Sequence, residues 1–198
     1  MDDLICPVCG AQGISGRGRV VVFNGQLIDR VLKIDAKESK ACSKLWASGR
    51  YTQLHIGSRE NPDLENIECL NDFERVTKLH VMLLDRKVDL APLARHAGTL
   101  TEYFCNDEIN SIVDLDRYSS LKSINQTWVS RMKFSNNHPQ LQELSFDKYC
   151  PKSNKDLGAL PMAPNLKVLD LLRSCIKTLL EMHRIRSLSL GGCTSSHK

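Results

Sequence analysis

Two cysteines near the amino terminus have the spacing of a metal-binding turn. Cys6 and Cys9 stand in the segment Cys-Pro-Val-Cys-Gly, whose turn aims both thiols at one point and whose glycine permits the tight backbone. Thiolates at this spacing bind Zn²⁺, which takes about four ligands. Cys42 is the third candidate ligand, and Cys69 or His55 could supply the fourth.

The Cys-x-x-Cys-Gly segment resembles a zinc knuckle, so zinc is a candidate cofactor. The sequence holds no second Cys-x-x-Cys, so a knuckle that has lost its metal, or a pair of free thiols, is the favoured interpretation. Arg17 and Arg19 lie in the glycine-rich stretch that follows. Together with the cysteines they give an alternative function, a zinc-binding adaptor or nucleic-acid-binding protein.

The sequence carries no recognisable catalytic motif. Gly-x-Ser-x-Gly, the phosphate-binding Gly-x-x-x-x-Gly-Lys-Ser/Thr and His-Glu-x-x-His are all absent. His55 and His80 with Cys105 would form a Cys–His pair, but the pattern described next places Cys105 on an inward strand position, where a thiol packs as a small hydrophobe. We therefore expect a protein that is not an enzyme.

A recurring apolar pattern organises most of the chain. Residues 166–171 read Leu-Lys-Val-Leu-Asp-Leu, with apolar side chains at the first, fourth and sixth positions. The last two alternate as in a strand with one apolar face. The same pattern starts at residues 51, 76, 100, 121, 141, 166 and 185. Of its 21 inward positions, 20 are apolar, aromatic or Cys, and Gln126 is the exception.

Repeats of this length and pattern resemble those of leucine-rich-repeat proteins. The resemblance covers residues 51–198 in about seven irregular repeats of the cysteine-containing type. It implies an α/β fold, a solenoid with a curved parallel sheet and short helices or 3₁₀ turns on the convex side. Leu90, Leu93 and Ala97 have the spacing of such a returning helix. Cys150, Cys175 and Cys193 are interpreted as buried repeat residues.

The first 50 residues are expected to cap the repeats. Asn24-Gly25 lies between the apolar runs 19–23 and 26–29, and Asn-Gly at such a place is a strong signal of a β-hairpin. A repeat array needs a cap because its end would otherwise expose the core. The predicted organisation is thus a knuckle and hairpin in residues 1–50, followed by the repeat domain in residues 51–198.

The outward strand positions should form the binding surface. Outward side chains of neighbouring parallel strands stack into rows across the concave face, which is the usual binding site of such arrays. These rows bring together aromatic and Met side chains with charges of both signs, a combination that protein interfaces favour. The side chains expected to contact the partner are His55, His80, Met82, Phe104, Asn125, Glu143, Asp147 and Asp170.

The composition of the chain limits the classes of partner and the cellular compartments that are expected. The net charge is +4, and no basic run marks a nucleic-acid site, so a protein partner is expected in preference to nucleic acid. No stretch has the ~18–20 apolar residues of a membrane span, and the acidic start lacks the apolar core of a secretory signal. We expect a cytoplasmic protein whose eight cysteines are reduced thiols or metal ligands. The chain resembles small bacterial cytoplasmic repeat proteins, some of which are immunity proteins, and this resemblance makes a toxin one candidate partner.

Overall fold

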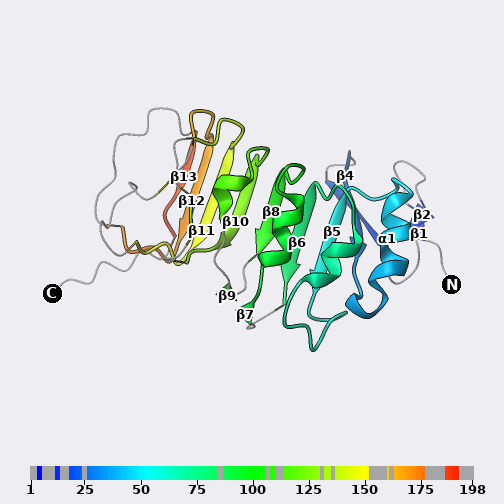
Figure 1. The fold of residues 1–198 in the computed structure, drawn as a ribbon. Coiled ribbons are helices and arrows are strands. Elements are labelled where there is room, and N and C mark those ends of the chain that lie inside the picture. The colour runs from blue at the N-terminus through cyan, green and yellow to red at the C-terminus, as the bar shows by residue number, and fades with distance from the viewer. Residues whose placement is uncertain are drawn as a thin grey trace.

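A single large sheet organises the part of the chain that the structure describes. The computed structural model describes residues 4–5, 12–13, 18–23, 26–83, 87–105, 108–109, 114–129, 132–134, 137–151, 160, 163–176 and 186–191. Within these ranges nine strands lie in the order β13-β12-β11-β10-β8-β6-β5-β4-β3 (Figure 1). Each of these strands therefore pairs with its neighbours in chain order, and four short strands (β1, β2, β7 and β9) lie outside the sheet.

The large sheet is parallel except at its amino-terminal edge. β3 and β4 form an antiparallel hairpin, and from β4 to β13 every pair is parallel. The seven predicted parallel strands are thus confirmed. β3 and β4 pair as the predicted hairpin requires, while its turn residues Asn24 and Gly25 lie outside the described residues. The strands are β3 (Gly18–Phe23), β4 (Gln26–Lys33), β5 (Gln53–Gly57), β6 (Lys78–Met82), β8 (Glu102–Cys105), β10 (Ser123–Thr127), β11 (Glu143–Asp147), β12 (Val168–Leu172) and β13 (Ser187–Ser189).

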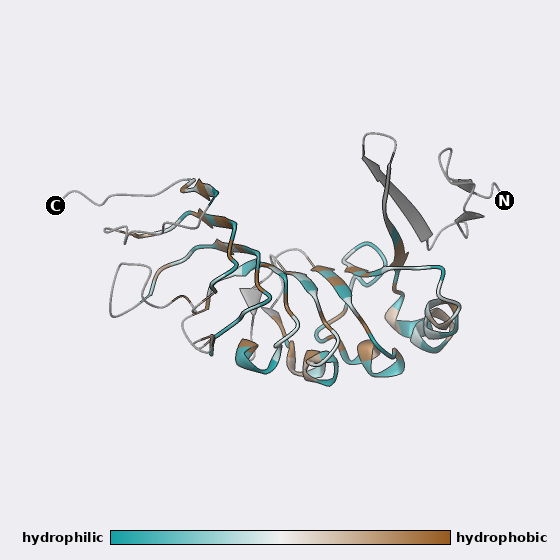
Figure 2. Ribbon diagram, turned by 90° about the horizontal axis from the view of Figure 1, so that it is seen from above, coloured by the Kyte–Doolittle hydropathy of each residue, from teal (hydrophilic) through white to brown (hydrophobic). Residues whose placement is uncertain are grey.

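Short helical segments return the chain from one strand to the next. They are η1 (Ala36–Glu38), α1 (Ser39–Ala47), η2 (Glu68–Asp72), η3 (Ala91–His96) and η4 (Leu115–Arg117), and all but α1 are 3₁₀ helices. η3 falls on the predicted returning segment, with its proline at the helix start. Figure 2 shows these segments along one side of the sheet.

Two small pairings complete the described secondary structure. β1 (Leu4–Ile5) pairs antiparallel with β2 (Gln12–Gly13), and β7 (Lys87–Val88) pairs parallel with β9 (Glu108–Ile109). In the described part of the chain, no helix is long and apolar enough to cross a membrane.

The core lies between the sheet and the returning segments. Leu144, Leu169 and Leu188 are register partners in adjoining parallel strands, as the apolar pattern requires. The whole row contributed by the fourth pattern position consists of Leu54, Leu79, Tyr103, Ile124, Leu144, Leu169 and Leu188. All but Leu188 are buried, and Leu188 is 45% exposed where the described sheet ends.

Gln126 occupies an inward position although it is polar. It lies between Cys105 and Phe146 in register and is fully buried. Its amide nitrogen donates to the sulfur of Met132 at 3.0 Å, while its amide oxygen is buried without a hydrogen bond in the structure. The burial of the apolar face of β10 therefore places Gln126 in the core, although leaving its amide oxygen without a hydrogen bond costs about 1–3 kcal/mol.

Stability should fall in weak acid because of a buried histidine. His96 is 2% exposed, and its Nε2 lies 3.3 Å from the carbonyl oxygen of Leu70. Burial lowers its pKa in the folded chain, and this outweighs the opposing effect of the Leu70 carbonyl. The unfolded chain therefore takes up a proton near pH 6.5 that the folded chain resists, so this contribution to stability is complete above pH ~6.5 and is lost as the pH falls below it.

Denaturant unfolding at pH 7.5 and pH 5.5 tests this expectation. The free energy of unfolding of the wild type should drop more between the two values than that of His96→Gln, which keeps an amide near the same carbonyl. Equal drops in both proteins would assign the acid sensitivity to other groups.

Candidate binding face of the sheet

The sheet face opposite the core presents one continuous row of polar and aromatic side chains. Because side chains alternate along a strand, every residue paired in register with His55 points to the same face. This central row runs across eight strands and consists of Lys33, His55, His80, Phe104, Asn125, Ser145, Asp170 and Ser189. We call the face that carries it the outer face.

Three aromatic rings stand next to one another in this row. The rings of His55 and His80 meet edge to face, with centroids 4.9 Å apart, and those of His80 and Phe104 do so at 4.0 Å. All three side chains are partly exposed. Edge-to-face contact is the arrangement that aromatic quadrupoles prefer. The contacts therefore hold a semi-rigid aromatic strip at the surface.

An open groove of about 280 Å³ runs beside the aromatic strip. Its lining includes His80, Phe104 and Asn125 from the central row, with Lys78 and Glu102 from the row before it. Lys78 and Glu102 face each other across β6 and β8 with Nζ and Oε1 3.1 Å apart. The groove thus combines an aromatic wall with a charged wall in which the two opposite charges are already paired.

A second ion pair, Lys33–Glu60, lies at the amino-terminal end of the aromatic strip, next to His55. Lys33 donates to Glu60 at 2.9 Å. Partial burial pushes the pKa of Glu60 upward, but the hydrogen bond and charge of Lys33 outweigh it and leave the pKa below its ordinary value. A Cβ on Gly57 would lie 2.7 Å from the Nε2 of His55 and 2.9 Å from the Oε2 of Glu60, so this glycine lets the two side chains approach each other.

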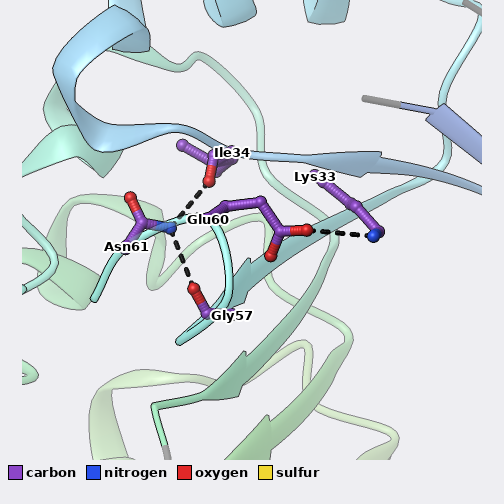
Figure 3. A network of polar contacts seen from close by, with 5 residues as sticks. All are labelled: Lys33, Ile34, Gly57, Glu60 and Asn61. Atoms are coloured by element: carbon purple, nitrogen blue, oxygen red, sulfur yellow. Dashed lines mark hydrogen bonds and ion pairs between the residues drawn. The ribbon is translucent and has the colours of Figure 1, made fainter. Parts of the chain in front are cut away.

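Asn61 fixes the backbone under this ion pair, as Figure 3 shows. Its amide nitrogen donates to the carbonyl oxygens of Ile34 at 2.8 Å and Gly57 at 3.1 Å. Its amide oxygen accepts from the backbone N–H of Ala36 at 2.7 Å. The side chain is 5% exposed. One buried amide therefore joins the ends of β4 and β5 to the loop that presents Glu60.

The carboxyl-terminal half of the outer face is acidic. Glu143 is exposed and accepts from the hydroxyl of Ser123 at 3.0 Å. Asp147 is 8% exposed, and its carboxylate is held by two hydrogen bonds from the guanidinium of Arg173. Asp170 is partly exposed, and its Oδ1 is buried without a hydrogen bond in the structure. Asp147 thus has an internal cation, whereas the described side chains provide none for Glu143 and Asp170.

The predicted contact residues therefore share one face but not one pocket. His80, Phe104 and Asn125 line the groove. His55 and Asp170 extend the central row to either side, and Glu143 lies in the row before it. Met82, opposite Gly57 in register, and Asp147 lie in the row after it. The face extends over several strands, as an extended partner would require.

The predicted zinc ligands are placed only in part. Cys6 and Cys9 lie outside the described residues, while Cys42 is fully buried in the core. Burial raises the pKa of the Cys69 thiol to about 12, with further contributions from Asp72 and Cys42. Without a metal, the Cys69 thiol is thus protonated at neutral pH. Among the described side chains, no three His, Cys, Asp or Glu residues are placed to hold a metal ion, and zinc at Cys6, Cys9 and Cys42 stays a prediction.

Cys150 and Cys175, interpreted from the sequence as buried thiols, are instead joined by a disulfide. Cys150 and Cys175 form a disulfide between the segments that follow β11 and β12, with Cα atoms 5.2 Å apart. Cys150 is exposed and Cys175 partly exposed, so the interpretation of these two as buried repeat residues is wrong. Cys193 lies outside the described residues. Cys105, in contrast, is fully buried at its predicted inward position.

The sequence contained a signal for the disulfide, namely the equal positions of Cys150 and Cys175 in their segments, which the apolar strand pattern does not include. Cys150 and Cys175 each stand nine places after the start of their segments, at residues 141 and 166. Equal positions in successive parallel units lie side by side, at a distance of about 5 Å. Lys33 and Glu60 gave no such signal, because neither belongs to the recurring pattern.

Comparison of the chain with protein-family models, curated proteins and solved structures finds no match.

Proposed function

We propose that this chain is a leucine-rich-repeat solenoid that binds one protein partner through the outer face of its sheet and performs no chemistry itself. The observation that carries the proposal is the partly exposed aromatic strip of His55, His80 and Phe104 beside an open groove. Rigid aromatic side chains at a surface lose little entropy on binding and supply much of the affinity at protein interfaces.

The charges around the strip support a protein surface as the partner. Four charges beside the aromatic strip already form two ion pairs, Lys33–Glu60 and Lys78–Glu102. A surface with compensated charge around an apolar centre has the layout of a protein interface, with anchors in the middle and a polar rim. A nucleic acid would be favoured by uncompensated cations in the same place.

A toxin remains one form that this partner could take. In this proposal the chain acts in the cytoplasm as an immunity protein and neutralises the toxin by covering it. The proposal rests on resemblance to a class of small repeat proteins, and a fold alone does not fix a function. Co-expression with the product of a neighbouring gene, scored by protection of the host cell, is the direct experiment.

Phe104→Ala should weaken partner binding at least about fivefold, which corresponds to more than about 1 kcal/mol. The phenyl ring is in contact with His80, and its loss removes one wall of the groove. The fold should be almost unaffected, because the side chain is on the outer face. A partner captured by the wild type from a native lysate and then purified allows titration calorimetry on both proteins.

Glu65→Gln provides the matched control. Glu65 is exposed on the segment between β5 and η2, outside the strands that form the outer face. Its substitution should leave both binding and the melting temperature unchanged. A captured partner that binds wild type and Phe104→Ala equally well would show that it contacts another surface.

A further inference from the structure

Among the residues that the structure describes, the outer face has a region of two carboxylates without ion pairs, away from the aromatic strip. Glu143 lies opposite Val168 in register, and Asp170 follows two residues after Val168 on the same strand. Side chains on one sheet face that are diagonal neighbours are about 7–8 Å apart, close enough for both carboxylates to contact one bound cation. Neither forms an ion pair with any described residue.

Among the described residues, none forms an ion pair with Asp170. Its register neighbours on both sides are Ser145 and Ser189, which bring no charge. Arg173, in the turn after β12, donates its guanidinium hydrogen bonds to Asp147. The exposed cations Lys122 and Lys167 lie one residue before their strands begin, and Lys167 donates to the side chain of Gln142 at 2.9 Å.

Apolar surface adjoins the carboxylates. Leu172 is 40% exposed and stands two residues after Asp170, so both side chains lie on the outer face. A carboxylate next to exposed aliphatic surface suits a long cationic side chain, whose methylene stem covers the leucine while its head reaches the oxygens. Arg fits this place better than Lys, because its planar fork binds two carboxylates at once.

We propose that the partner carries an arginine or lysine that inserts between Glu143 and Asp170, together with an apolar or aromatic side chain that fills the groove at Phe104. This inference rests on the proposed function and specifies the chemistry of the partner. Phe104 and Asp170 are three strand steps apart, which is about 14 Å. An extended chain crosses that distance in about four residues, so the partner segment is basic, contains an aromatic or apolar anchor and runs across the strands.

Peptide selection tests the proposal even while the natural partner is unidentified. A random peptide library is selected on the wild-type protein, and clones that also bind Phe104→Ala are discarded. The retained peptides should carry an arginine or lysine about four residues from an aromatic or apolar anchor. Their dissociation constants should rise at least about tenfold on Glu143→Gln/Asp170→Asn and stay unchanged on Glu65→Gln.

A charge swap separates a direct contact from a structural effect. A retained peptide whose arginine is replaced by glutamate should lose binding to the wild type and regain it on Asp170→Lys. Retained peptides that have no basic residue, or that bind the double variant as tightly as the wild type, would overturn this inference and leave the aromatic groove as the binding site. If no peptide depends on Phe104, both the inference and the proposed function are wrong.

Discussion

Replacing Leu169 by Ala should lower the free energy of unfolding by about 2–5 kcal/mol. Leu169 is fully buried in the centre of β12, and its register partners are Leu144 and Leu188 in the two adjoining strands. Truncation removes the transfer free energy of the side chain and leaves a cavity that the rigid strands close only in part. Urea unfolding, followed by circular dichroism at neutral pH, measures the change.

Leu172→Ala is the matched control for this measurement. It removes the same atoms from the same strand, but Leu172 is 40% exposed on the opposite face. Its substitution should cost well under half of the Leu169→Ala effect, because less surface returns to water and no cavity forms. If the two costs were equal or reversed, the assignment of inner and outer faces would be wrong.

The parallel strands were predictable because every strand buries its side chains at the same positions of the apolar pattern. Each strand must place its fourth and sixth pattern positions against one core, so the apolar alternation recurs along the chain and can be read without knowing any contact. The pattern placed even Gln126 correctly on the buried face. The hairpin was predictable for a local reason, since Asn-Gly between apolar runs favours one kind of tight turn.

The electrostatics of the outer face could not be predicted in the same way. Asp147 was expected to be available to a partner, yet Arg173 binds it from the turn after β12, where the arginine backbone has φ of 47°. Which cation reaches which carboxylate depends on the path of such turns, and the strand pattern does not encode it. Lys33 and Glu60 meet for a similar reason, because Asn61 holds the loop in place.

Breaking the Cys150–Cys175 disulfide should lower the free energy of unfolding by about 3–4 kcal/mol, the loop-closure entropy of a cross-link over this length of chain. The sequence separation is 25 residues, equal to the spacing between the first residues of β11 and β12. The cross-link joins the segments after β11 and β12, where the backbone N–H of Cys175 also donates to the carbonyl oxygen of Tyr149 at 3.1 Å. Unfolding midpoints of the wild type, with and without dithiothreitol, measure the effect.

The double variant Cys150→Ser/Cys175→Ser separates the cross-link from other effects of the reductant. Its unfolding midpoint should match that of the reduced wild type and should not respond to dithiothreitol. The disulfide restrains only the segments after β11 and β12. Amide hydrogen exchange of the double variant should therefore be faster than in the wild type in β11 and β12, and unchanged in β5 and β6. Reaction of Cys150 and Cys175 with maleimide in the untreated native protein would contradict the disulfide. An unchanged unfolding midpoint after complete reduction would show that the packing around Tyr149 holds β11 and β12 together without the disulfide.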